Sequence, residues 1–101
     1  MPQLNLKADY LTQVKTILKQ HAPDLEVWAY GSRIHNNGHE ASDLDLVIRN
    51  PANLQIPMNN LAQLKQAFID SNLPILVDIM DWALLPDTYR EEIEKQHLVV
   101  T

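Results

Sequence analysis

Residues 27–48 decide the fold, and they read VWAYGSRIHNNGHEASDLDLVI. One apolar run leads into Gly31-Ser32, and a second apolar run carries Asp43 and Asp45. The pattern predicts a buried strand ending at a Gly-Ser turn, a polar connection of ten residues, and a second buried strand. Because side chains alternate between the faces of a strand, we expect Asp43 and Asp45 side by side on one face.

The two aspartates predict a bound cation. Adjacent carboxylates repel one another and resist burial unless a cation neutralises them. Mg²⁺ suits such a pair, because proteins commonly hold it with one or two carboxylates together with substrate phosphates. A Gly-Ser turn beside the pair can present backbone N–H groups and a hydroxyl to a phosphate. The stretch therefore indicates metal-assisted phosphoryl or nucleotidyl transfer.

Each of these residues also has a simpler interpretation. The aspartates could form a polar strand face turned to water, and a Gly-Ser turn alone only ends a strand. Asp is depleted in strands, however, and two on one face repel, so the spacing to Gly31-Ser32 favours a catalytic pair. Arg33 could clamp a phosphate with its guanidinium, or it could form an ion pair with Asp43 or Glu40.

A third aspartate, Asp78, lies in a later apolar run at residues 75–80. Alternation divides that run into one face with Ile75, Val77 and Ile79 and another face with Leu76, Asp78 and Met80. Asp78 could pair with Arg33 or cap a turn. Beside two other carboxylates, the interpretation as a third metal ligand is favoured.

The spacing of Gly-Ser, ten residues and Asp-x-Asp resembles the signature of the polymerase-beta-like nucleotidyltransferase superfamily. The longer match, from Gly31-Ser32-Arg33 to Ser42-Asp43-Leu44-Asp45-Leu46, resembles its minimal nucleotidyltransferase branch, in which a third aspartate follows on a later strand. That branch often has Arg-x-Arg-Gly after the serine. Here His35 stands in place of the second arginine and Asn36 in place of the glycine.

The resemblance implies a catalytic site and a partner. Two Mg²⁺ ions would be held by Asp43 and Asp45, the second ion also by Asp78, and ATP would donate AMP. Its phosphates would lie at Gly31, Ser32, Arg33 and Ser42. The acceptor would be a tyrosine of a HEPN toxin, which the chain would neutralise as an antitoxin. Two alternatives stay open: a non-catalytic protein that only covers its partner, and a small-molecule nucleotidyltransferase.

Composition narrows the class of protein. The 101 residues suffice for one domain, residues 1–101, without a separate substrate domain. The net charge of −5 argues against nucleic-acid binding, which needs lysine and arginine. Cysteine is absent, which excludes disulfides and cysteine-based zinc sites. His35 and His39 are spaced as two zinc ligands, but no third ligand is near. We expect a cytoplasmic protein, without a membrane segment, that can form homo- or hetero-oligomers.

Hydrophobic periodicity predicts an α/β (α+β) domain, a small mixed sheet covered by helices. The first helix covers residues 7–21, the second is marked by Met58 to Phe68, and the last covers residues 86–96 with Tyr89 and Ile93 inward. The strands are expected at residues 26–30, 43–49 and 75–80, in the order helix, strand, strand, helix, strand, helix. The short connection between the first two strands predicts that they are neighbours.

Overall fold

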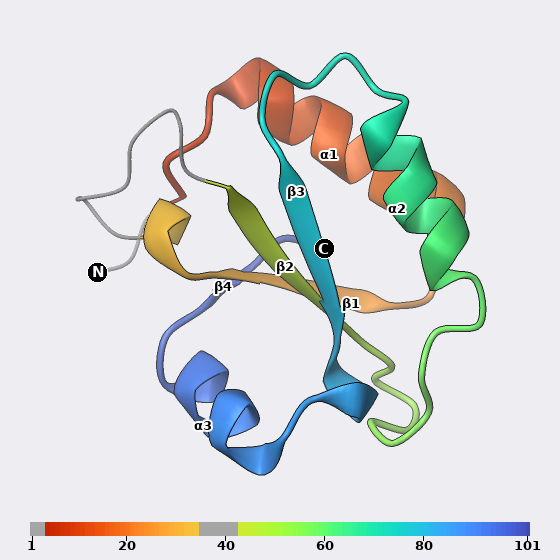
Figure 1. The fold of residues 1–101 in the computed structure, drawn as a ribbon, viewed down its shortest axis with the longest axis vertical. Coiled ribbons are helices and arrows are strands. Elements are labelled where there is room, and N and C mark those ends of the chain that lie inside the picture. The colour runs from red at the N-terminus through yellow and green to blue at the C-terminus, as the bar shows by residue number, and fades with distance from the viewer. Residues whose placement is uncertain (1–3, 35–42) are drawn as a thin grey trace.

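The computed structural model describes residues 4–34 and 43–101 (Figure 1). Its helices are α1 (Ala8–His21), α2 (Leu61–Ile69) and α3 (Asp87–Lys95), with short 3₁₀ turns η1 (Ser32–Ile34) and η2 (Trp82–Leu84). Its strands are β1 (Glu26–Tyr30), β2 (Leu44–Arg49), β3 (Val77–Asp81) and β4 (Leu98–Val99). No helix in this part of the chain is long and apolar enough to cross a membrane.

The strands form one mixed sheet in the order β3-β2-β1-β4. Strands β1 and β2 are neighbours, as their short connection predicts, and they are antiparallel, whereas β2 and β3 are parallel. On the other side of β1, β4 pairs antiparallel, and the Val100 N–H donates to the Val27 carbonyl at 2.8 Å. The predicted mixed α/β fold is confirmed.

Helices α1 and α2 cover one face of the sheet (Figure 1). Every second residue of the central strands points into this layer, because side chains alternate along a strand. The main buried residues are Val14 and Leu18 of α1, Leu64 and Phe68 of α2, Val27 and Ala29 of β1, Leu44, Leu46 and Ile48 of β2, and Ile79 of β3. This continuous apolar core fixes the strand register on which the opposite face depends.

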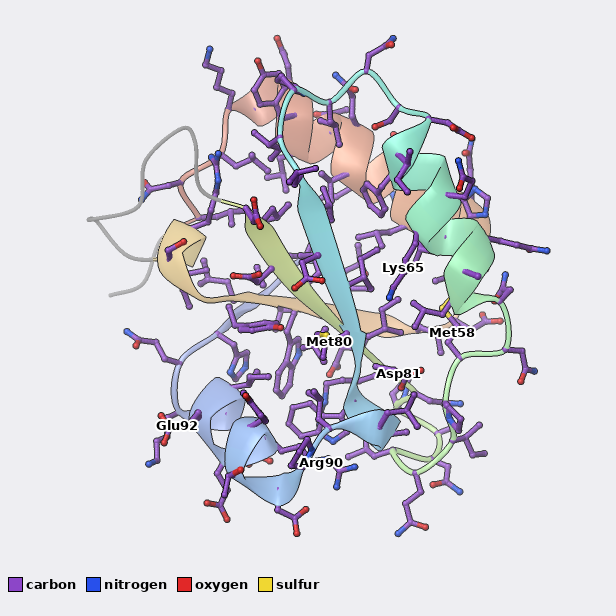
Figure 2. The ribbon with its side chains drawn as sticks, viewed as in Figure 1. Met58, Lys65, Met80, Asp81, Arg90 and Glu92 are labelled. Atoms are coloured by element: carbon purple, nitrogen blue, oxygen red, sulfur yellow. The ribbon has the colours of Figure 1, made fainter. Side chains whose placement is uncertain are left out.

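On the opposite face, α3 and η2 cover only part of the sheet. They bury a second cluster, which consists of Trp28, Val47, Trp82, Leu85 and Ile93. The guanidinium of Arg49 lies 3.7 Å from the ring centre of Trp28 and 4.5 Å from that of Trp82, and it pairs with Glu26. Figure 2 shows Arg90 of α3 beside η2, where its guanidinium donates to the carbonyls of Trp82 (2.9 Å) and Ala83 (3.0 Å). No other helix or 3₁₀ turn of residues 4–34 and 43–101 belongs to this cluster.

Several predicted boundaries were wrong. The third strand is β3, residues 77–81, rather than 75–80, although the Leu76 carbonyl already accepts from the Leu44 N–H at 2.9 Å. The second helix starts at Leu61, because the Met58 N–H donates instead to the buried carboxylate of Asp81 at 2.7 Å. Asp81 also caps η2 through the Ala83 N–H.

Two further differences concern the last quarter of the chain. Tyr89 of α3 is exposed rather than inward, because Ile93 fills the space beneath this short helix. Strand β4 was not predicted, because it has only two residues and gives almost no periodic signal. The sheet ends at β4 on one side and at β3 on the other.

Candidate active site

The strand register places three polar side chains in one row across the open face of the sheet. Tyr30 at the end of β1 is paired with Asp45 of β2, and Asp45 is paired with Asp78 of β3. Directly paired residues on neighbouring strands point to the same side of a sheet. The row therefore brings together two predicted site residues that are 33 positions apart in the sequence.

The three predicted metal ligands differ in exposure. Asp43 and Asp78 are exposed, and Asp45 between them is half-buried. Asp43 precedes β2, which starts at Leu44, so the second strand is one residue shorter than predicted. Within residues 4–34 and 43–101, no three acidic or histidine side chains already converge into a metal cage.

The electrostatics of Asp45 fit a cation site. Burial raises the pKa of Asp45, and the negative charges of Asp78 and Asp43 raise it further. A divalent cation would remove this repulsion and replace the water lost by burial. The side chains offer only carboxylate oxygens, which are hard ligands of the kind that Mg²⁺ takes. The residues therefore fit the magnesium that the sequence predicts.

Tyr30 is a site residue that sequence reasoning missed. Burial raises the pKa of Tyr30 to about 12, with smaller contributions from Asp45, Asp78 and Tyr89. Its hydroxyl therefore stays protonated at neutral pH and is a hydrogen-bond donor beside the carboxylates. In the sequence, Tyr30 reads as the end of an apolar run, and only the pairing of β1 with β2 shows its proximity to Asp45.

Gly31 allows the turn after β1 to pass close to Asp45. Its φ of +80° lies in the left-handed region that favours glycine. A Cβ at this position would come within 2.4 Å of the Oδ2 atom of Asp45. Glycine is therefore needed here both for the backbone conformation and for the space. The next residue, Ser32, is exposed and begins η1.

Arg33 is buried, with 5% of its surface exposed. Its Nη1 donates to the carbonyl of Asn5 at 2.7 Å, and the Asn5 N–H donates to the carbonyl of Arg33 at 2.6 Å. This placement favours a structural role, because the guanidinium fastens the segment before α1 to the Gly-Ser turn. A phosphate contact by Arg33 stays a prediction. Ser42, and the histidine pair His35 and His39, lie outside the described residues.

Comparison with known proteins identifies the family. The profile of the family described as nucleotidyltransferase domain matches residues 11–101. The chain belongs to this family. The predicted nucleotidyltransferase is thus confirmed, and the Gly-Ser turn and the aspartate row lie within the matched residues of this nucleotidyltransferase domain.

The proteins that resemble this nucleotidyltransferase include one curated relative and one solved structure. It is 44% identical over 100 residues to the probable protein adenylyltransferase MntA of Haemophilus influenzae, a match that covers 97% of this chain and 84% of that protein. A solved structure of a mutant toxin–antitoxin pair, MntA-HpeT, contains a chain of the same fold, with a TM-score of 0.71 and 18% identity. That match covers 90% of this chain and 72% of the other.

Proposed function

We propose that this nucleotidyltransferase moves AMP from ATP, with Mg²⁺, to a tyrosine hydroxyl of a HEPN partner protein. The observation that carries the proposal is the pairing of Asp45 with Asp78 on adjacent strands, next to the Gly31-Ser32 turn. The chain would act as a single domain, in the cytoplasm, where ATP is present.

The nucleotide would lie between the turn and the carboxylates. Asp43 and Asp45 would hold two Mg²⁺ ions, the second ion also bound by Asp78, since their crowded negative charges fit cations. When bound, these ions would offset charge on the attacking and leaving oxygens. Ser32 and the backbone N–H groups of its turn would contact the β- and γ-phosphates.

The reaction is a displacement at the α-phosphorus of ATP. The acceptor oxygen forms a new P–O bond, the bond from the α-phosphorus to the bridging oxygen breaks, and pyrophosphate leaves with the bonding electrons. The acceptor proton passes to a carboxylate or to water. Asp78 lies at the edge of the row, is exposed and is the candidate to accept this proton.

The similar proteins support a polypeptide as the acceptor. The Haemophilus influenzae relative is named a probable protein adenylyltransferase, and the solved structure is of a toxin–antitoxin pair. A partner protein would supply the acceptor hydroxyl.

The test is to incubate the chain with labelled ATP, Mg²⁺ and the HEPN protein encoded by the neighbouring gene. We expect AMP on a tyrosine of that protein, located by mass spectrometry, and no transfer when EDTA replaces Mg²⁺. Tight binding without modification would instead support a covering protein. Neither binding nor modification would favour a small-molecule nucleotidyltransferase.

The role of Ser32 is tested separately. The residues directly beside Ser32 in the sequence, Gly31 and Arg33, are not bases that could activate it, so we expect Ser32 to bind phosphate rather than act as a nucleophile. The variant Ser32→Ala is expected to weaken ATP use by about tenfold to a hundredfold, the contribution of one hydrogen bond to a charged group. No nucleotide-protein adduct at residue 32 is expected in rapid-quench samples of the wild type, and a trapped adduct there would refute this role.

A further inference from the structure

The order of the strands separates the side of the site that would hold the phosphates of ATP from the side on which the acceptor hydroxyl would enter. Gly31-Ser32 follows β1, Asp45 lies on β2, and Asp78 lies on β3 at the edge of the sheet. In phosphoryl transfer, the attacking and leaving oxygens lie roughly in line on opposite sides of the phosphorus. With the phosphates held on the β1 side, the attacking hydroxyl has to arrive over β3.

The open face of β3 is apolar on both sides of Asp78. Leu76 and Met80 share that face, since each is two positions from Asp78, and they are 73% and 37% exposed. Figure 2 shows Met80 on the part of β3 nearer to α3. A single exposed apolar residue needs no explanation, but two that flank a catalytic carboxylate define the surface that an acceptor meets.

The surroundings of this surface are acidic. Asp43 and Asp78 are exposed, and Asp45, which is paired with Asp78, is half-buried between them. This charge repels a polyanion such as nucleic acid and attracts a basic segment. A sugar hydroxyl would gain nothing from the apolar side chains, whereas a phenol ring would pack against Leu76 and the thioether of Met80.

We propose that Leu76 and Met80 form the acceptor-binding surface, on which a basic segment of the partner protein lays the ring of its tyrosine while the hydroxyl reaches Asp78. This inference rests on the proposed function and extends it, because it names the residues that select the acceptor. It also predicts that acceptor binding and ATP binding can be changed independently.

The test compares the double variant Leu76→Ser and Met80→Ser with the control variant Ile69→Ser. Ile69 is 72% exposed, like Leu76, but lies on α2 behind the opposite face of the sheet. We expect the double variant to raise the KM for the HEPN protein by about tenfold or more, as the loss of apolar contact predicts. The Mg²⁺-dependent ATP affinity, measured by calorimetry, is expected to stay within about twofold of the wild type. Ile69→Ser is expected to change neither quantity.

The outcomes separate the two proposals. If the wild type modifies the HEPN protein and the double variant does so with the same KM, the acceptor surface is wrong and the proposed function stands. If ATP affinity falls together with acceptor binding, Leu76 and Met80 contribute to ATP binding, which also overturns the inference. If the wild type transfers no AMP to the HEPN protein, both proposals fail. Leu76→Ser alone, at the most exposed position of the surface, repeats the measurement should the double variant fold poorly.

Discussion

Replacing Asp45 by asparagine is expected to lower AMP transfer by about a thousandfold or more. Asp45 is the centre of the row, paired with Asp78 on one side and Tyr30 on the other. The neutral amide removes one charge from the proposed metal site, and a bound metal ion contributes several kcal/mol to stabilising charge in phosphoryl transfer. Transfer of labelled AMP measures the loss. Asp24→Asn, at an exposed position before β1, is the matched control and is expected to retain full activity.

The same substitution is expected to preserve or increase stability without a nucleotide. The folded-state pKa of Asp45 is raised, so the folded protein binds that proton more tightly than the unfolded chain does. At a pH above this pKa, the charged carboxylate therefore lowers the free energy of unfolding. This loss of stability disappears as the pH falls through the folded-state pKa of Asp45. Asp45→Asn removes the cost, at most about 1 kcal/mol after solvent screening. A lower midpoint temperature of thermal unfolding at pH 7 in the variant than in the wild type would contradict this account.

Replacing Gly31 by alanine is expected to reduce both stability and ATP binding. The left-handed backbone at φ +80° costs an alanine about 1–2 kcal/mol. The added Cβ would also meet the Oδ2 atom of Asp45 at 2.4 Å, so either the turn or the carboxylate has to move. We expect a loss of about 2 kcal/mol in the free energy of unfolding and at least about tenfold in Mg²⁺-dependent ATP affinity.

Two measurements distinguish this effect from a general disturbance of the turn. Ser32→Ala changes the neighbouring exposed residue and is expected to leave the free energy of unfolding unchanged in a urea titration. In Gly31→Ala, ATP affinity is expected to stay low under conditions in which the variant is fully folded by circular dichroism. Normal ATP affinity in the folded variant would show that Asp45 tolerates the displacement and that the close approach has no role in binding.

Sequence reasoning could propose the core of the candidate site because its chemistry is local. Gly31-Ser32 and Asp43-Leu44-Asp45 lie within one short stretch, and charges in an apolar strand contradict its pattern unless they have a function. Alternation along the strand also predicted which residues share a face with Asp78, namely Leu76 and Met80. The structure exposes all three side chains. Long periodic segments such as α1 were predicted within one residue for the same reason.

What sequence reasoning missed depends on contacts between distant segments. Tyr30 joins the site through the register of β1 with β2, and no local pattern distinguishes it from a core aromatic. Arg33 carries its charge beside the Gly-Ser turn, yet the structure buries it against Asn5, a contact across 28 positions. From the sequence, Asp81 resembles a further carboxylate of the site. In the structure it caps η2 and accepts a hydrogen bond from the backbone N–H of Met58.

The pairing of β4 with β1 has a consequence for how the protein is made. Val27 donates to the carbonyl of Thr101 and accepts from the N–H of Val100, so one edge of the central strand is completed by residues that the ribosome adds much later. Until then, the nascent β1 keeps an apolar strand edge open, which is the kind of edge that other chains pair with. The Gly-Ser turn at its end is therefore translated early but reaches its final support late. A chain that stopped before residue 98 would contain all three aspartates but would lack β4, so this edge of β1 would stay unpaired.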